Sequence, residues 1–219
     1  MIFIDTDSEL PHNNVGIVFK DKKDAVRDEL IPYTKAIHAD ICINDSSNKS
    51  IVIGYMNGHF FNLSLFCLHK RSKQIIVLLR AYNEETFDIC RNLCKETNCF
   101  KGNGQNIFHL DRFYIKPEYR GMGIGTSAYI EFYNMLPLYL HQKIRYIGLF
   151  PDPITNDLNF DSMYDMPKSK RDLTIQKLKQ FYSSLGFKEM KIKTEYMYTD
   201  CYNTSYNRPF ADWDSVNTH

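Results

Sequence analysis

The chain has 219 residues, of which 43% are hydrophobic and 24% are charged, as in a globular domain with an apolar core. This composition excludes a disordered or fibrous chain. Basic and acidic residues number 27 and 26, and the resulting net charge of +1 disfavours nucleic acid or an acidic membrane as a partner. The length fits one large domain, or one domain with an elaborated end.

Neither a signal peptide nor a membrane span is expected. The first residues, MIFIDTD, lack a basic segment and a long apolar stretch. The longest clean apolar run, Ile75–Leu79, is much shorter than the roughly 20 residues that a bilayer requires. We therefore expect a soluble, cytoplasmic protein with no membrane partner.

The six cysteines are expected to be structural. They lie at positions 42, 67, 90, 94, 99 and 201. Cys90 and Cys94 are four residues apart on one face of a predicted helix, but a zinc site usually needs about four ligands in tight pairs. In a cytoplasmic protein the thiols should be reduced, so we expect buried cysteines and no metal.

Strand and helix signals alternate along the first half of the chain. The strand-like segments are Val15–Phe19, Ala39–Ile43, Ile51–Met56, Phe60–Leu65 and Ile75–Leu79. The helical segments are Lys22–Leu30 and Glu84–Glu96, followed by a turn at 101–104. The pair Asn57-Gly58 predicts a hairpin turn between two of these strands.

The second half has a clearer order of elements. Strands are predicted at Ile107–Ile115, Ile144–Phe150, Phe187–Ile192 and Tyr196–Thr199. One helix should run from Gly123 until Pro137 interrupts it, and another from Lys170 to Leu185, closed by Gly186. Pro151–Pro167 is a polar loop, and the tail from Asp200, with Trp213, has no assignment. This order predicts an α/β or α+β fold around a mixed sheet.

The glycine-rich turn after Ile115 is the most informative motif. Arg120 is followed by three alternating glycines, Gly121, Gly123 and Gly125, at the start of a predicted helix. Without Cβ atoms the backbone amides can crowd one small volume, and the positive end of the helix dipole points at the same place. The guanidinium adds a permanent cation. Together these features predict a pyrophosphate site.

Other phosphate-binding motifs do not fit this turn. A Walker A loop needs a lysine after its last glycine, and none follows here. A dinucleotide fingerprint needs glycine where this chain has Thr126. A kinase glycine loop joins two strands, whereas this turn begins a helix. The pattern that remains is Arg-x-x-Gly-x-Gly.

This pattern resembles the coenzyme A motif of the GNAT (Gcn5-related) N-acetyltransferases. A second segment, FYSSLGF at Phe181–Phe187, resembles the end of the family's fourth helix. The resemblance covers about Ile107–Thr199. It implies a mixed, mostly antiparallel sheet flanked by helices, with 1–106 as the poorly matched substrate side, 107–200 as the acetyl-CoA-binding core and 201–219 as a polar tail.

The resemblance also implies residue roles. The backbone of Phe113, Tyr114 and Ile115 would pair with the pantetheine arm of acetyl-CoA. The pyrophosphate would be held by Arg120, Gly121, Met122, Gly123, Ile124, Gly125 and Thr126. Tyr182 would protonate the departing thiolate, which is chemically reasonable for a phenol, although packing is the alternative. Ile175 stands where the family usually has asparagine, so that contact is missing here.

A general base is less clear from the sequence. His109 and Asp111 share one face of the predicted strand by its period of two, and histidine titrates in the useful pH range. In some members of the family an acid occupies the position of His109. The alternative is a structural or solvent-facing polar pair.

The expected function is transfer of an acetyl group from acetyl-CoA to a primary amine. The alternatives are a GNAT-like toxin that acetylates aminoacyl-tRNA and a non-catalytic acyl-CoA sensor, and the resemblance leaves a homodimer open. The polar loop contains four aspartates, Asp152, Asp157, Asp161 and Asp165. These would attract a cationic acceptor, although a solvated loop is the alternative.

Overall fold

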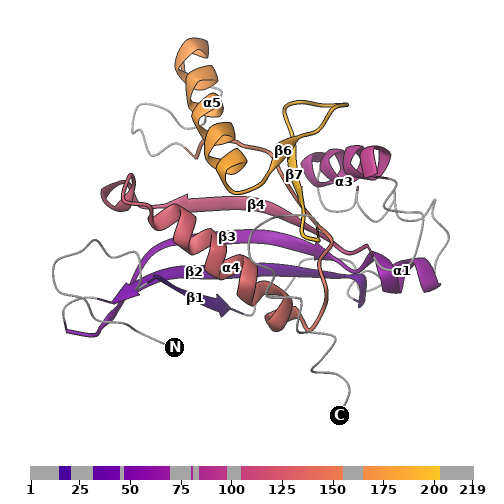
Figure 1. Ribbon diagram of the computed structural model, residues 1–219, viewed down its shortest axis with the longest axis horizontal. Helices are drawn as coiled ribbons and strands as arrows, with labels where there is room; N and C mark the ends of the chain where they lie inside the picture. Colours follow the sequence, from indigo (N-terminus) through magenta and orange to yellow (C-terminus); the bar gives the residue numbers. More distant parts are fainter. Residues whose placement is uncertain are drawn as a thin grey trace. The chain divides into compact units, whose positions relative to one another are not determined.

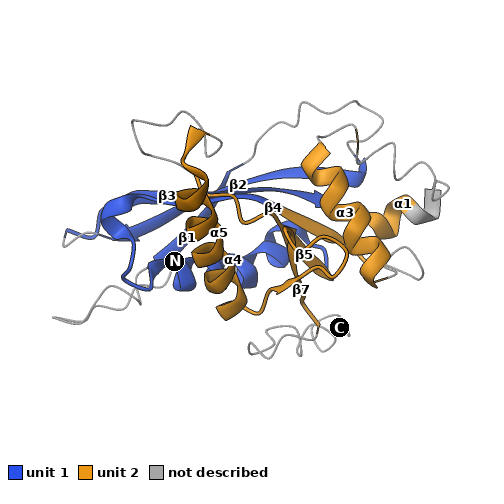
Figure 2. Ribbon diagram, turned by 90° about the horizontal axis from the view of Figure 1, so that it is seen from above, with its two compact units in different colours: residues 1–61, 110–144 blue, residues 62–109, 145–219 orange. Residues whose placement is uncertain are grey.

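The computed structural model describes residues 15–20, 32–44, 47–69, 80, 84–97, 105–154 and 165–202. The predicted helix Lys22–Leu30, the predicted strand Ile75–Leu79, the turn at 101–104 and Trp213 lie outside these residues. No helix within the described ranges is long and apolar enough to cross a bilayer. The chain forms two compact units, residues 1–61 with 110–144 and residues 62–109 with 145–219 (Figure 2).

The described elements confirm a mixed, mostly antiparallel sheet with helices. The strands are β1 (Val15–Lys20), β2 (Thr34–Asn44), β3 (Ser50–Phe61), β4 (Ile107–Ile115), β5 (Tyr146–Leu149), β6 (Lys188–Glu189) and β7 (Met197–Asp200). The helices are α1 (Leu63–His69), α3 (Glu84–Thr97), the 3₁₀ turn η2 (Pro117–Tyr119), α4 (Ile124–Leu140) and α5 (Lys168–Ser184) (Figure 1). The strand order is β1-β2-β3-β4-β5-β7-β6; β1/β2, β2/β3, β5/β7 and β6/β7 are antiparallel, and β4/β5 is parallel.

In the first unit, α4 packs on β1 through an apolar stripe. Its buried residues Ile124, Ala128, Phe132 and Leu136 recur every four positions. From β1, the ring of Phe19 stacks on Phe132 at 5.6 Å between centroids. This spacing is the helical period that the sequence showed, and the buried stripe fixes the direction in which the N-terminus of α4 points.

One predicted turn and the end of one predicted strand are wrong. Asn57-Gly58 lies inside β3, where Asn57 pairs with His38 and Gly58 with Ile37 of β2. The long ladder with β2 outweighs the local turn signal. The predicted strand Phe60–Leu65 ends at Phe61, because Asn62 caps α1: its side-chain oxygen accepts a hydrogen bond from the Leu65 amide at 2.9 Å.

Pro137 does not end α4, contrary to the prediction. The helix continues to Leu140 and ends at His141, whose φ of 51° is left-handed. A proline in the last turn removes only one backbone hydrogen bond, and its buried ring contributes apolar packing. The helix therefore includes one more turn than the sequence predicted.

In the second unit, α3 covers β5. Phe87, Ile89, Cys90 and Leu93 of α3 are buried, as the amphipathic pattern predicted. Cys42, Cys90, Cys94 and Cys201 are buried thiols that form no disulfide within the described residues, which agrees with the structural role expected for them.

Gly148 allows α3 to approach β5 closely. A Cβ atom at Gly148 would lie 2.7 Å from Cγ2 of Ile89, which is fully buried. Because a β-branched side chain has few alternative rotamers, Gly148→Ala should lower the free energy of unfolding by about 1–3 kcal/mol. Gly16→Ala is the matched control, since its Cβ would meet nothing within 4 Å. Urea denaturation of both variants tests this, and equal midpoints would contradict it.

Candidate functional site

The glycine turn connects β4 to α4 within the first unit. After Ile115, the Lys116 amide donates a hydrogen bond to the Ile53 carbonyl at 2.9 Å, which ties the end of β4 to β3. Gly121 and Gly123 have φ angles of 77° and 73°. These left-handed values favour glycine, so the two positions fold the chain back into the N-terminus of α4 as the sequence predicted.

Five consecutive backbone amides of this turn are open to a ligand. Within the described residues, the N–H groups of Gly121, Met122, Gly123, Ile124 and Gly125 donate no hydrogen bond. The amides of Thr126 and Ser127 donate to the Gly123 carbonyl at 3.0 and 3.2 Å. The available set therefore ends at Gly125, one residue earlier than expected, although the Thr126 hydroxyl can still reach a ligand. Open amides at a helix N-terminus are groups that can bind an anion.

Arg120 is fixed beside these amides. Its Nε donates to the Ile115 carbonyl at 2.7 Å, and its guanidinium lies 5.5 Å from the ring centroid of Tyr114. The side chain is exposed, and its terminal nitrogens have no hydrogen bond within the described residues. The guanidinium is therefore held in place while keeping donors for a phosphate.

The C-terminal half of β4 extends beyond its ladder with β5. The pairing of β4 with β5 ends at His109, opposite Gly148, whereas β4 continues to Ile115. Phe113, Tyr114 and Ile115 are half-buried in this extension. The resemblance implies that these three residues pair with an extended ligand. Such pairing requires a stretch of β4 beyond the ladder with β5.

Tyr182 lies in the last turn of α5 and is 7% exposed. Its ring contacts those of Phe181 and Phe187 edge to face, and the distances between ring centroids are 5.2 and 5.6 Å. Burial raises the pKa of the phenol above its ordinary value, so the hydroxyl remains protonated over the physiological range. Tyr182 is thus packed, as the alternative reading expected, and also able to donate a proton. Packing alone does not decide between the two roles.

His109 is fully buried between two residues of α3. The Thr86 hydroxyl lies 2.9 Å from Nδ1 of His109, and a Glu85 carboxylate oxygen lies 3.2 Å from Nε2. The side chain of Glu85 is 27% exposed. Glu85, which lines the pocket surface, is thus hydrogen-bonded to the fully buried ring of His109. Asp111 is half-buried and contacts Arg112 at 3.5 Å.

Comparisons with solved structures find distant similarities. The toxin AtaT complexed with acetyl-methionyl-tRNAfMet has 13% sequence identity over 86% of this chain and 96% of its own, with a TM-score of 0.41. A mutant AtaT toxin bound to the C-terminus of the antitoxin AtaR and acetyl-CoA has 12% identity over 85% and 93%, with a TM-score of 0.41. A KacTA–DNA complex has 10% identity over 85% and 92%, also at 0.41.

Sequence comparisons find no relative. No protein-family model matches the chain, and no curated protein matches it. TM-scores near 0.4 at such low identity are too low to support a functional argument.

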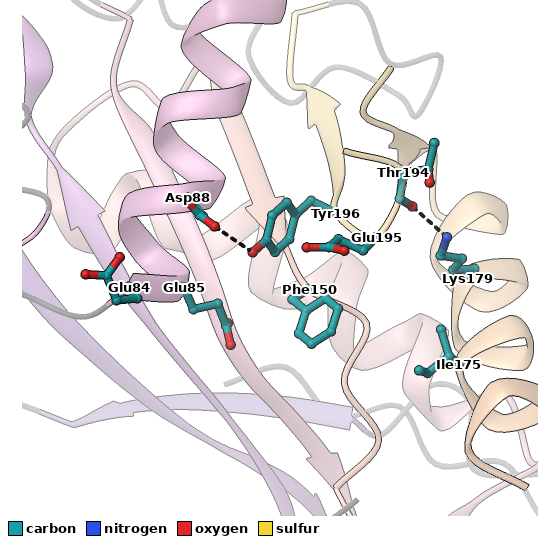
Figure 3. Close-up of a pocket in the computed structure, with 9 residues that line it drawn as sticks. All are labelled: Glu84, Glu85, Asp88, Phe150, Ile175, Lys179, Thr194, Glu195 and Tyr196. Atoms are coloured by element: carbon teal, nitrogen blue, oxygen red, sulfur yellow. Dashed lines mark hydrogen bonds between the residues drawn. The ribbon is translucent and has the colours of Figure 1, made fainter. Parts of the chain in front are cut away.

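A pocket of about 530 Å³ opens within the second unit, between α3 and α5 (Figure 3). Its charged lining consists of four carboxylates and one lysine: Glu84, Glu85, Asp88, Glu195 and Lys179. The other lining residues are Phe150, Ile175, Thr194 and Tyr196. The sequence analysis identified none of these carboxylates as functional.

The aspartates of the polar loop do not form this pocket in the described structure. Asp157 and Asp161 lie outside the described residues. Asp152 is half-buried and Asp165 is exposed, and neither lines the pocket. Among the described residues, the carboxylates that line the pocket come from α3 and from the segment that precedes β7.

Proposed function

We propose that the chain is an acetyltransferase of the GNAT type that transfers the acetyl group of acetyl-CoA to a primary amine. The row of open amides from Gly121 to Gly125 is the main support, because unpaired amides at a helix N-terminus are donors suited to an anion. Arg120 adds a fixed cation. These groups suit the pyrophosphate of coenzyme A, and the extension of β4 suits its pantetheine arm.

The proposed reaction needs two proton movements. The neutral amine attacks the thioester carbonyl carbon, a C–N bond forms and the C–S bond breaks. Tyr182 donates its proton to the departing thiolate and recovers one from solvent, so the products are the acetylated amine and free thiol. A protonated phenol in a water-poor environment is suited to this step.

Glu85 is our candidate for accepting the proton of the amine. It is half-buried and lines the pocket, whereas His109 is fully buried, and its carboxylate is held by the His109 ring. Thr86 fixes the other side of that ring. His109 therefore acts through Glu85 as a positioning residue, or receives the proton from it. Asp111 is the alternative candidate for the base.

Coenzyme A binding tests the site directly. The ligand should raise the melting temperature, with a stabilisation of about 2.7 kcal/mol at one hundred times Kd. Gly125→Val should abolish this rise, because a branched side chain would occupy the space in front of the open amides. Gly123→Val is less informative, since its φ of 73° strains valine even without ligand.

The ligand-free protein provides the control for Gly125→Val. Valine has a higher helix propensity than glycine, so the variant should melt near the wild-type temperature without coenzyme A. Unchanged coenzyme A binding by this variant would reject the site. Binding without release of free thiol from acetyl-CoA, with every amine tried, would favour the acyl-CoA sensor.

One observation keeps the aminoacyl-tRNA alternative in the acceptor screen. α5 has five basic residues and one acidic residue, and Lys168, Lys170 and Lys177 are exposed. The net charge of +1 for the whole chain conceals this basic helix. Such a surface attracts polyanions. Thiol release with aminoacyl-tRNA but not with small amines would support this alternative.

A further inference from the structure

The pocket between α3 and α5 has an excess of negative charge. Its lining has four carboxylates and one lysine, and Lys193 beside the pocket contacts two of these carboxylates, which leaves an excess of two negative charges. Lys179 donates to a Glu189 oxygen at 3.0 Å and to the Thr194 carbonyl at 2.6 Å, so its ammonium is already occupied. Lys193 contacts Asp88 and Glu195 at 2.9 and 3.4 Å. Within the described residues Glu84 has no ion pair, and Glu85 is paired with the buried His109.

Aromatic and aliphatic walls complete the pocket. The rings of Phe150 and Tyr196 meet edge to face at 5.6 Å, and Ile175 lies across from them on α5 (Figure 3). The ammonium of Lys193 lies 5.3 Å from the ring centroid of Tyr196, so this ring already interacts with a cation. Carboxylates combined with aromatic faces and apolar walls favour organic cations over metal ions.

The pocket and Tyr182 lie on the same face of α5. Ile175 and Lys179 line the pocket, and Tyr182 follows them at helical spacing on the same face. The pocket therefore lies against the same face of α5 as Tyr182, the proposed thiolate donor.

We propose that this pocket binds the acceptor, and that the acceptor is an aliphatic amine with at least two ammonium groups. The proposal rests on the acetyltransferase function above. The reacting nitrogen must lose its charge before it attacks, so an acceptor with one amine would lose its attraction to the pocket at that moment. A second ammonium retains it, with Glu84 and Glu195 as its carboxylates and the apolar walls against its methylene groups.

The experiment compares acceptors and variants by thiol release. Spermidine should have at least about tenfold higher kcat/KM than propylamine, and added salt should reduce this preference. Glu84→Gln with Glu195→Gln should raise KM for spermidine about tenfold or more and leave KM for acetyl-CoA unchanged. The control is Glu131→Gln on α4, which removes one carboxylate charge by the same substitution from a residue outside the pocket.

Calorimetry with spermidine in the absence of acetyl-CoA gives a reading independent of turnover. Wild-type protein and Glu131→Gln should bind spermidine, and the double variant should bind it at least about tenfold more weakly. Equal binding by the double variant, no binding by the wild type, or a preference for glutamate or aminoacyl-tRNA would overturn the proposal. Failure to bind coenzyme A, with spermidine binding intact, would reject the acetyltransferase and leave the cation site standing.

Discussion

Tyr182→Phe should reduce kcat by roughly 10- to 1,000-fold while the affinity for coenzyme A stays unchanged. The substitution removes the phenol oxygen and leaves the ring, so the edge-to-face contacts with Phe181 and Phe187 remain. The developing thiolate then has no proton donor at this position. Single-turnover thiol release at saturating acetyl-CoA measures the effect on the chemical step.

A second variant separates chemistry from packing. Phe181→Leu alters the packing beside Tyr182 and keeps its hydroxyl, so kcat should fall much less than in Tyr182→Phe. Melting temperatures of both variants show whether the last turn of α5 is intact. A rate for Tyr182→Phe equal to that of the wild type, where chemistry limits turnover, would assign Tyr182 to packing alone.

The features that the sequence predicted best are set by local chemistry. Gly121 and Gly123 have left-handed backbone angles, and few other residues adopt them, so the turn could be read from its glycines. β4 has the predicted bounds, Ile107–Ile115. The apolar stripe on α4 was predicted from its helical period. Gly186 was predicted as the cap after α5, and its φ is 86°. Both are local signals in the sequence.

The errors have different causes, and the clearest is a local signal that tertiary pairing outweighed. Asn57-Gly58 is a strong turn pair, but pairing with β2 along the whole of β3 holds it extended. Asn62 was a readable cap for α1 and was missed. The availability of amides could not be predicted either, because the bond from Thr126 to the Gly123 carbonyl depends on where α4 begins.

The pocket could not be predicted, because its residues are far apart in the chain. Glu84 and Glu85 look like ordinary acidic residues in the first turn of a helix. Glu195 lies 110 residues after Glu85, in a short polar segment. Only the folded second unit brings them together. The aspartate-rich loop at 151–167 suggested a cationic acceptor, and the structure offers different carboxylates for the same ligand chemistry.

The pKa of Tyr196 is raised mainly by burial, and the pocket carboxylates act in the same direction. Burial, aided by the nearby carboxylates of Asp88, Glu195 and Glu85, raises the pKa of this phenol to about 12, although Lys193 acts in the opposite direction. The Tyr196 hydroxyl lies 3.5 Å from an Asp88 oxygen. The same charges that disfavour a phenolate here stabilise an ammonium.

Glu85→Gln should lower kcat by about 10²- to 10⁴-fold if this carboxylate accepts the proton of the amine. The glutamine amide keeps an oxygen that can accept the hydrogen bond from His109, so the buried ring should stay in place. The amide cannot take up a proton, and the bound ammonium then has no route to its reactive neutral form. Initial rates at saturating acetyl-CoA and spermidine, as a function of pH, provide the measurement.

The pH profile distinguishes a proton acceptor from a mere binding charge. As pH rises towards the amine's own pKa of about 10, solution supplies neutral amine, and the defect of Glu85→Gln should shrink. Glu84→Gln removes the same charge from the same pocket and should raise KM for spermidine without lowering kcat. His109→Gln should have a smaller effect on kcat than Glu85→Gln, because His109 is fully buried and acts through Glu85. An unchanged kcat in Glu85→Gln, or a defect that persists at high pH, would show that the pair of Glu85 and His109 is structural and would leave Asp111 as the base to test.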